Sequence, residues 1–319
     1  MIIVKLISDF NLTKDNKTKK LWLSLGNFDG VHIAHQKILR DTVKKAEKYD
    51  FTPGILLLEP HPEIKFHNKS NFLLTTLEEK INKISSLGIQ VGVLKEFDRE
   101  FAELSPREYS KWLCDKLRVQ GVSVGFDYSF GQKGMGSPSD LQDFGKQLGF
   151  EVSVIEPIKI DGAIIVSSQL CRKYIREGHI NKANQMLSSP YTISGTVTKG
   201  AGRGANLGFP TANIKIPKHK IIPRLGVYLV RVEVNQNKYW GVCNVGNKPT
   251  FSGEELMAET FLLDNKQDLY NEELTVSFLD FIRDERKFLD SNTLVSQVNR
   301  DIKMARDIIA NLESKGNYQ

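Results

Sequence analysis

The feature that most limits the possible folds of this chain is a change of hydrophobic pattern at Ser188-Ser189-Pro190. Before this point, short apolar runs alternate with stretches of helical periodicity. After it, apolar and polar residues alternate in short segments that are separated by turns. A chain of 319 residues is also too long for one ordinary core and suits two domains. We therefore expect two domains, over residues 1–186 and 187–319.

The first half has the pattern of a parallel sheet covered by helices. Short, continuous apolar runs predict buried strands at Leu21–Leu25, Gly54–Leu58, Ile89–Leu94, Gly121–Phe126 and Glu151–Ile155. Helices are expected between them, near residues 33–49, 76–87, 106–118 and 139–148, and a last one near 168–187. Alternation of strands and helices places helices on both faces of a parallel, Rossmann-like sheet, which makes this half an α/β domain.

The second half has the pattern of a small antiparallel β-barrel. Its strands are expected at Tyr191–Thr198, Gly226–Val234, Tyr239–Val245, Met257–Leu263 and Leu274–Phe281. We find no convincing helical pattern between them, which favours a barrel. Apolar residues of helical spacing from Leu294 to Leu312 then predict one closing helix.

Composition excludes several classes of protein. The longest apolar clusters, such as Ile55–Leu58, are far shorter than the roughly 20 residues that span a bilayer. The first ten residues lack the basic and apolar regions of a secretory signal. Cys114, Cys171 and Cys243 are far apart and form no CxxC pair, so neither a disulfide framework nor a zinc site is indicated. We expect a soluble, cytoplasmic protein.

Charge is distributed unevenly along the second half. Residues 187–250 contain 9 Lys and Arg against 1 acidic residue, whereas residues 251–290 contain 4 against 11. The basic block could bind nucleic acid, surround a phosphate site, or merely form the solvent-exposed faces of a sheet. The acidic block would suit a metal or a general base. Charge alone favours the solvent-exposed sheet.

The first candidate site is a strand that runs into a glycine-containing turn. Leu21–Leu25 leads into Gly26-Asn27-Phe28-Asp29-Gly30, and His32 and His35 follow where a helix should begin. Glycines allow a sharp turn and a close approach to a ligand. A helix N-terminus offers free N–H groups to an anion. Histidines three residues apart lie on one helix face, so both could reach one phosphate group.

The second candidate site is a glycine-rich segment in the predicted barrel. Residues 198–204 contain three glycines and lead to Leu207-Gly208-Phe209-Pro210-Thr211-Ala212-Asn213. Pro210 excludes a Rossmann fingerprint, and the GK[ST] of a Walker A loop is missing. Successive backbone N–H groups of such a turn can still bind an anion. Thr211 and Asn213 project to the same side of an extended segment and offer the hard oxygen ligands that suit Mg²⁺.

These segments together resemble one enzyme family. GNFDGVHIAHQ, at residues 26–36, is similar to the HxGH-type motif of nucleotidylyltransferases and in particular of the prokaryotic bifunctional riboflavin kinase/FMN adenylyltransferases, or FAD synthetases. Further segments follow in the family's order, at residues 58–66, 125–131, 166–172, 210–213, 226–228, 244–251, 259–260, 268–270 and 281–288. Ala34 and Asn271 stand where the family usually has Gly, and Gln169 stands where it usually has Thr.

The resemblance implies that the second domain phosphorylates riboflavin to FMN and that the first converts FMN and ATP to FAD and pyrophosphate. It implies that His32, His35 and Arg172 act in adenylyl transfer and that Glu259 is the general base of the kinase. ATP and its phosphates would be bound by Gly26, Phe28, Asp29, Ser168, Gly200, Gly202, Arg203, Gly204, Gly208, Pro210, Thr211 and Asn213. Flavin would be bound by Pro60, Pro62, Phe66, Asp127, Phe130 and Arg283. Thr211 and Asn213 would hold Mg²⁺.

The partners expected from this resemblance are the small molecules ATP, riboflavin and FMN, with neither nucleic acid nor membrane, and a monomer is favoured. The basic block would then surround the triphosphate. Two alternatives remain open: a riboflavin kinase with a weakened first domain, and a binding module that senses flavin or binds nucleic acid. The RNA-binding form lacks an RNP-like aromatic strand or an arginine-rich run.

Overall fold

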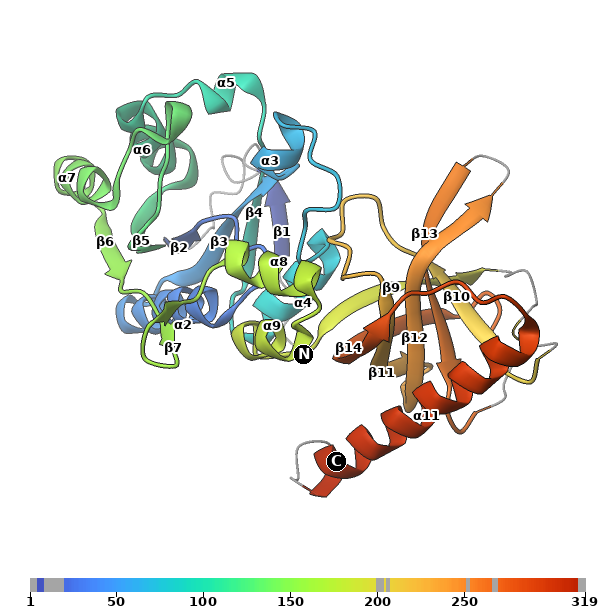
Figure 1. The fold of residues 1–319 in the computed structure, drawn as a ribbon. Coiled ribbons are helices and arrows are strands. Elements are labelled where there is room, and N and C mark those ends of the chain that lie inside the picture. Colours follow the sequence, from blue (N-terminus) through green and yellow to red (C-terminus); the bar gives the residue numbers. More distant parts are fainter. Residues whose placement is uncertain are drawn as a thin grey trace. The chain divides into compact units, whose positions relative to one another are not determined.

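The computed structural model describes residues 5–8, 20–198, 204, 207–250, 253–265 and 269–314. The chain divides into two compact units, Met1–Ser168 and Gln169–Gln319 (Figure 1). This division precedes the expected boundary at 186/187 because two helices, α8 (Ser168–Glu177) and α9 (Ile180–Leu187), belong mostly to the second unit. Asn184 of α9 accepts a hydrogen bond from the Tyr191 N–H and donates one to the Phe278 carbonyl, both at 2.8 Å. The boundary at 186/187 stays a prediction.

The first unit is built on a parallel sheet of six strands in the order β1-β4-β3-β2-β5-β6. The strands are β1 (Lys5–Ser8), β2 (Leu21–Leu25), β3 (Thr52–Glu59), β4 (Val91–Glu96), β5 (Val119–Gly125) and β6 (Glu151–Ile155). The five strands expected from the sequence are confirmed. The edge strand β1 was not predicted, because four residues carry little periodicity.

Helices cover both faces of this sheet, as the alternating pattern predicted. Ile38 and Leu39 of α2 (Ile33–Tyr49) and Ile84 of α4 (Leu77–Ser86) pack on one face. Leu113 of α6 (Pro106–Leu117) and Leu141 of α7 (Pro138–Leu148) pack on the other. Shorter elements complete the unit: α3 (Pro62–Lys65), α5 (Arg99–Ala102), the 3₁₀ helix η1 (Gln132–Gly134), β7 (Lys159–Ile160) and β8 (Ile164–Ile165).

The second unit contains a closed barrel of six antiparallel strands in the order β10-β13-β12-β11-β14-β9 (Figure 1). The strands are β9 (Tyr191–Thr198), β10 (Thr211–Lys215), β11 (Gly226–Val234), β12 (Asn237–Thr250), β13 (Gly253–Leu262) and β14 (Glu273–Asp284). Large rings fill the interior, since Tyr191 and Tyr228 each pack against Phe278. The barrel and its closing helix are therefore confirmed.

The helices of the second unit differ in one respect from those expected. One helix was predicted near 168–187, but the structure has two, α8 and α9, because Gly178 has a φ of 80° and ends the first. The closing helix is α11 (Ser291–Ser314), which lies against the outer face of the barrel. Its Ala305 is fully buried in a cluster with Val227 and Leu279.

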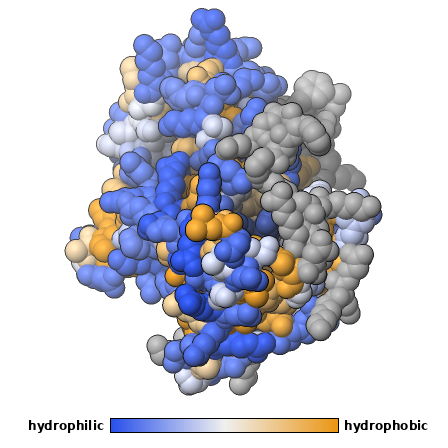
Figure 2. Space-filling view, turned by 45° about the vertical axis from the view of Figure 1, so that its right-hand side comes forward, coloured by the Kyte–Doolittle hydropathy of each residue, from blue (hydrophilic) through white to orange (hydrophobic). Residues whose placement is uncertain are grey.

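The surface in the view of Figure 2 is mostly hydrophilic, and hydrophobic residues form small separate areas on it. Across the described ranges of the chain, we find no helix with both the length and the apolar character needed to cross a bilayer.

Candidate active sites

Three of the predicted site segments meet at one edge of the parallel sheet. They follow the carboxyl ends of β2, β3 and β5, which are adjacent strands. From β2 the chain first extends the sheet through β3 and β4 and then returns to the other side of β2 at β5. Crevices at such a switch point are the usual ligand sites of open parallel sheets. The topology therefore brings residues 26–32, 60–66 and 126–130 to one edge.

The turn after β2 has an unusual backbone that tertiary hydrogen bonds hold in place. Phe28, Gly30 and Val31 have φ of 48°, 85° and 47°. The buried carboxylate of Asp29 accepts hydrogen bonds from the N–H groups of Leu74 and Thr75 at 3.0–3.1 Å. Both Phe28 and Asp29 are at most 1% exposed. Their predicted roles in ATP binding stay predictions, and they are limited to backbone contacts because the side chains face the protein.

The two histidines lie side by side at the start of α2. His32 is the N-cap residue, and its Nδ1 accepts a hydrogen bond from the His35 N–H at 3.3 Å. The rings are stacked with centroids 3.6 Å apart, and Phe28 packs against His35. An accepting Nδ1 places the proton of a neutral His32 on Nε2, which can donate to a phosphate oxygen. No acidic side chain lies in the first turn of α2 to compete with an anion there.

Two residues that sequence reasoning missed contact this turn. Thr75 Oγ1 accepts a hydrogen bond from the Gly30 N–H at 3.0 Å, and the Lys80 Nζ donates to the Asn27 carbonyl at 3.0 Å. Both residues are buried, with Thr75 3% and Lys80 5% exposed. A capping box, formed by Thr76 and Glu79 at the start of α4, was the available signal that this segment is ordered.

The predicted flavin residues differ in how they are placed. Pro60 and Pro62 are half-buried, Asp127 is exposed, and Phe66 is 48% exposed with its ring edge-on to Phe97. Phe130, in contrast, is a core residue that packs between Tyr109 and Tyr128. Because Phe130 is only 5% exposed, its structural role is the better supported one. The flavin contacts of all five stay predictions.

Tyr109 and Tyr128 beside Phe130 share a hydrogen bond between their hydroxyls, 2.9 Å apart. Burial raises the pKa of both hydroxyls, so both remain protonated near neutral pH. The pair is suited to hold residues 126–130 in place at the edge of the sheet, and not to act as a base.

The predicted site segment at residues 166–172 is divided between the two units. Ser168 belongs to the first unit, where its hydroxyl donates to the Asp29 carbonyl at 2.9 Å. Arg172 lies on α8 in the second unit and is buried. Its predicted part in adenylyl transfer stays a prediction.

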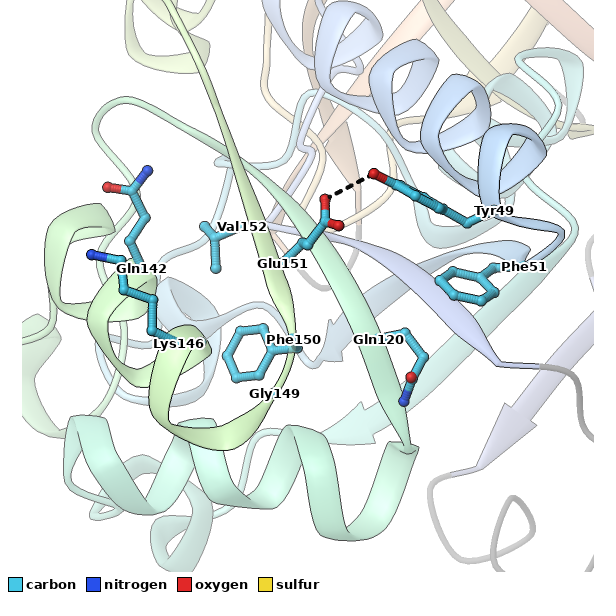
Figure 3. A pocket seen from close by; sticks show the side chains of 10 residues that line it. Tyr49, Phe51, Gln120, Gln142, Lys146, Gly149, Phe150, Glu151 and Val152 are labelled. Carbon is cyan, nitrogen blue, oxygen red and sulfur yellow. Dashed lines mark hydrogen bonds between the residues drawn. The ribbon is translucent and has the colours of Figure 1, made fainter.

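A surface hollow of about 660 Å³ lies at the opposite edge of the sheet (Figure 3). Its lining includes Tyr49 at the end of α2, Gln120 near the start of β5 and Glu151 at the start of β6. The Tyr49 hydroxyl donates to Glu151 at 3.4 Å. None of the predicted site residues lines this hollow.

In the barrel, strand register places the predicted base between two amides. Glu259 on β13 is paired with Asn213 on β10 and, on its other side, with Asn244 on β12. Directly paired residues point to the same face, with Cβ atoms about 4.5–5.5 Å apart. The structure therefore brings Glu259 and the predicted magnesium ligand Asn213 together. Asn244 was not predicted as a site residue, because register between strands is not visible in local periodicity.

The segment Pro210–Asn213 places a hydroxyl and an amide beside this carboxylate. The Asn213 Nδ2 donates to the Thr211 carbonyl at 3.1 Å. Thr211 is half-buried and Asn213 is 4% exposed. A hydroxyl and an amide oxygen beside a carboxylate fit a hard divalent cation. The thiol of Cys243 lies near this position, but burial raises its pKa to about 12, so it is not a nucleophile.

Only part of the glycine-rich segment lies within the described residues. Gly200, Gly202 and Arg203 are outside them. At Gly204, the carbonyl accepts the N–H groups of Leu207 and Phe209 at 3.1 and 2.8 Å, and an added Cβ would lie 2.5 Å from the Phe209 carbonyl oxygen. These two N–H groups are used inside the turn and do not extend the predicted anion nest. Gly208, with φ of 89°, and Pro210 are exposed.

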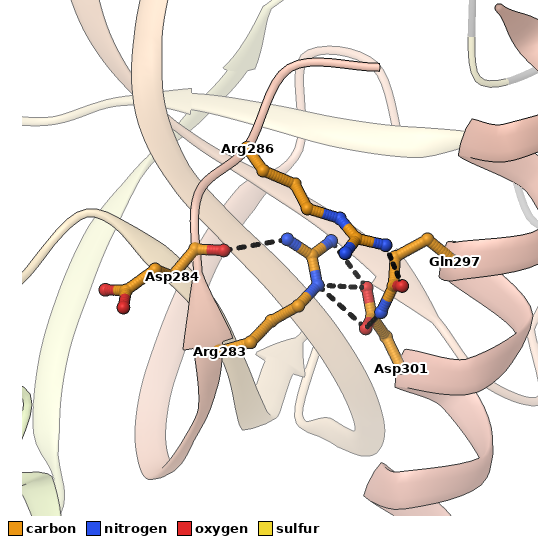
Figure 4. A network of polar contacts seen from close by, with 5 residues as sticks. All are labelled: Arg283, Asp284, Arg286, Gln297 and Asp301. Carbon is orange, nitrogen blue, oxygen red and sulfur yellow. Dashed lines mark hydrogen bonds and ion pairs between the residues drawn. The ribbon is translucent and has the colours of Figure 1, made fainter. Parts of the chain in front are cut away.

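Arg283 is fixed in a buried ion pair (Figure 4). Its Nε and Nη2 donate to the carboxylate of Asp301 on α11 at 2.7–3.1 Å, and its Nη1 donates to the Asp284 carbonyl at 2.8 Å. Gln297 also donates to Asp301 at 2.7 Å and accepts from Arg286. The Arg283 side chain is only 20% exposed. Its predicted flavin contact stays a prediction, although Nε, Nη1 and Nη2 each donate to a protein oxygen.

The basic block is partly neutralised by the acidic one. Lys215 on β10 pairs with Glu255 on β13 at 2.6 Å, and Arg224 pairs with Asp284 at 2.7 Å. Two further cations pack on aromatic rings, Arg231 on Trp240 and Lys220 on Tyr191. These four cations therefore have partners within the protein, and a bound triphosphate is not needed to explain their presence.

Comparisons with known proteins agree with the two-domain arrangement. The family model for FAD synthetase matches residues 14–169, and that for riboflavin kinase matches residues 187–309. A bifunctional riboflavin kinase/FMN adenylyltransferase from Listeria monocytogenes is 35% identical to this chain, over 91% of this chain and 93% of its own length. The chain belongs to the bifunctional riboflavin kinase/FMN adenylyltransferase family. It contains both domains, so a kinase alone is not favoured.

Other members of the bifunctional riboflavin kinase/FMN adenylyltransferase family are equally similar. The Bacillus subtilis enzyme of that name is 35% identical, over 95% of this chain and 96% of its own. Among solved structures, a protein named macrolide-efflux protein from Streptococcus pneumoniae has a TM-score of 0.85 at 29% identity. It covers 96% of this chain and 99% of its own, so the fold is shared along the whole length.

Proposed function

We propose that this chain makes FMN from riboflavin and ATP in its second domain, and FAD from FMN and ATP in its first. The observation that carries this proposal is the presence of both family domains in one chain, with relatives that are named for both activities. Each domain also supplies its own polar constellation: the paired histidines at the sheet edge, and Glu259 between two amides in the barrel.

In the adenylyl transfer, a phosphate oxygen of FMN attacks the α-phosphorus of ATP, and the bond to the pyrophosphate oxygen breaks. No protein nucleophile is needed, so positioning and charge stabilisation provide the rate acceleration. His32 donates from Nε2 to a phosphate oxygen, because its Nδ1 is held by the His35 N–H. His35 stacks beside it and donates to the same group. Arg172 is proposed to offset charge on the leaving pyrophosphate.

In the kinase reaction, the ribityl 5′-hydroxyl of riboflavin attacks the γ-phosphorus of ATP and loses its proton, while the bond from that phosphorus to the oxygen of the leaving ADP breaks. Glu259 is proposed to accept that proton, and its half-exposed position on the outer strand face suits a base that must meet substrate. Thr211 and Asn213 are proposed to hold Mg²⁺. When bound, this ion neutralises charge on the phosphate oxygens of ATP.

We propose a cytoplasmic protein, supported by three cysteines that are all free thiols. We propose a monomer whose partners are small molecules, with neither nucleic acid nor membrane. The pairing of Lys215 and Arg224 with carboxylates supports the exclusion of nucleic acid, because these cations are already neutralised.

The test is an incubation of the purified chain with riboflavin, ATP and Mg²⁺, followed by chromatographic separation of flavins. Formation of FMN and then FAD is expected. FMN without FAD would leave only the kinase, and formation of neither would overturn the proposal. Omission of Mg²⁺ with added chelator should stop both steps. Light scattering of the eluting protein tests the proposed monomer.

A further inference from the structure

Lys80 is a buried cation that none of the roles above uses. It lies on α4 and is only 5% exposed, and its Nζ donates to the Asn27 carbonyl at 3.0 Å. Lysine is almost never fully buried without a specific polar contact, because removing its charge from water is costly. One contact that Lys80 makes is therefore with the backbone of the turn that precedes the two histidines.

That turn requires external support. Phe28 and Val31 have left-handed backbone conformations, which a residue with a side chain adopts only when its surroundings impose them. The Ser168 hydroxyl supports the turn at the Asp29 carbonyl, and several further bonds come from one short segment, residues 74–80. Leu74 and Thr75 bind the Asp29 carboxylate, Thr75 also binds the Gly30 N–H, and Lys80 binds the Asn27 carbonyl.

The bond from Lys80 sets the direction of one peptide group. In a trans peptide the carbonyl and the following N–H point in opposite directions. With the Asn27 oxygen held toward Lys80, the Phe28 N–H points away from it. A free peptide could rotate and turn its carbonyl oxygen, which repels phosphate, to the side where the N–H now lies. His32 begins α2 four residues after Phe28, so a rotation here would also move the first turn of that helix.

We propose that Lys80 is a positioning residue for adenylyl transfer, which fixes the Asn27–Phe28 peptide and thereby the place of His32. This inference rests on the proposed FAD synthesis. It differs from a general stabilising role because the effect should be confined to residues 26–35 and to the adenylyl transfer. The kinase activity of the same chain, which arises in the other unit, reports whether the protein is otherwise intact.

The experiment compares Lys80→Met, Lys80→Arg and the control Ser123→Ala in the full chain. Ser123 is also buried in the first unit, where it accepts from Trp22 Nε1 at 2.8 Å and donates to Asp41 at 2.7 Å, and neither partner belongs to residues 26–36. Three quantities are measured for each variant: FAD formation from FMN, FMN formation from riboflavin, and hydrogen exchange of the peptide covering residues 26–36.

For Lys80→Met, kcat/KM for ATP in FAD formation should fall on the order of 30- to 100-fold, as for a displaced catalytic group. Exchange at the Gly30 and Val31 amides should rise about tenfold, as expected when one charged hydrogen bond is lost. FMN formation should be unchanged. Lys80→Arg, which keeps a charged donor, should restore most of the FAD rate. Ser123→Ala should lower the melting temperature without changing exchange in the turn.

The inference is overturned if Lys80→Met makes FAD at the parent rate, or if Ser123→Ala loses FAD formation and turn protection to the same extent. A parent protein that makes no FAD would instead overturn the proposed function, and the exchange data would still decide whether Lys80 holds the turn. If Lys80→Met fails to fold, Lys80→Gln, which retains an uncharged donor, is judged by the same outcomes.

Discussion

Removal of the Asp301 carboxylate should loosen the closing helix from the barrel. Gln297, Asp301 and Ala305 are the buried residues of α11 and lie four residues apart, on one face. The Asp301 side chain is 5% exposed, and its carboxylate accepts hydrogen bonds from both Nε and Nη2 of Arg283. In Asp301→Ala, the Arg283 guanidinium and the Gln297 amide both lose their acceptor while they remain largely buried.

The size of the effect follows from burial. Deleting one partner of a fully buried ion pair costs about 3–5 kcal/mol. The Arg283 side chain is 20% exposed and keeps its bond to the Asp284 carbonyl. We therefore expect a smaller loss in the free energy of unfolding, about 2–3 kcal/mol, because water can reach part of the guanidinium. For a unit of this size this corresponds to a fall in melting temperature of roughly 6–10 °C.

Calorimetry of the full chain measures this loss, and the transition that coincides with loss of kinase activity identifies the second unit. The double variant Asp301→Ala with Arg283→Leu should recover part of the stability, since no unpaired charge then remains. The matched control is the exposed pair between Arg306 on the same helix and Asp264, which follows β13, and Asp264→Ala should cost less than about 1 kcal/mol. If Asp301→Ala melts no earlier than Asp264→Ala, the buried pair does not hold the helix.

Three further changes test the assigned chemistry. Glu259→Gln should lower kcat of FMN formation by about 10²- to 10⁴-fold, the range for loss of a general base, while FMN-to-FAD conversion continues; a parent-like kinase would remove Glu259 from this role. His32→Ala should cost on the order of 2–4 kcal/mol of transition-state stabilisation in FAD formation, and more when combined with His35→Ala. FAD synthesis by the double variant at the parent rate would contradict this site. Ala34→Gly should lower the KM for ATP in FAD formation and destabilise α2 by up to about 1 kcal/mol; an unchanged KM would mean that the methyl group is already accommodated.

Local chemistry explains which parts of the fold could be predicted. The capping box of Ser105 and Glu108 lies within four residues, and the structure contains it as expected. Asn271 stands where glycine is usual, and its φ of 67° is the left-handed turn that asparagine tolerates. Likewise, a stretch of apolar residues directly indicates a buried strand, as in β2, where all five residues are buried.

The missed features depend on residues that are far apart in the chain. The Asp29 carboxylate, for example, accepts hydrogen bonds from the N–H groups of Leu74 and Thr75, which lie some 45 residues later in the chain. The burial of Asp301 on α11 could not be predicted from the pattern of that helix, because its partner Arg283 lies on a strand 18 residues earlier. Asn244 beside Glu259 is likewise set by the register between β12 and β13.

Closure of the barrel determines where copies of this chain could join during misfolding. Every strand from β9 to β14 has a neighbour on both sides, so an intruding strand must first open the barrel. Within the described ranges of the chain, the parallel sheet instead ends at β1 and β6, each of which pairs with a strand on one side. β6 starts with the exposed Glu151 and β1 is only four residues long, which are two of the means by which edges resist intermolecular pairing. Aggregation by strand addition during refolding should therefore begin in the first unit.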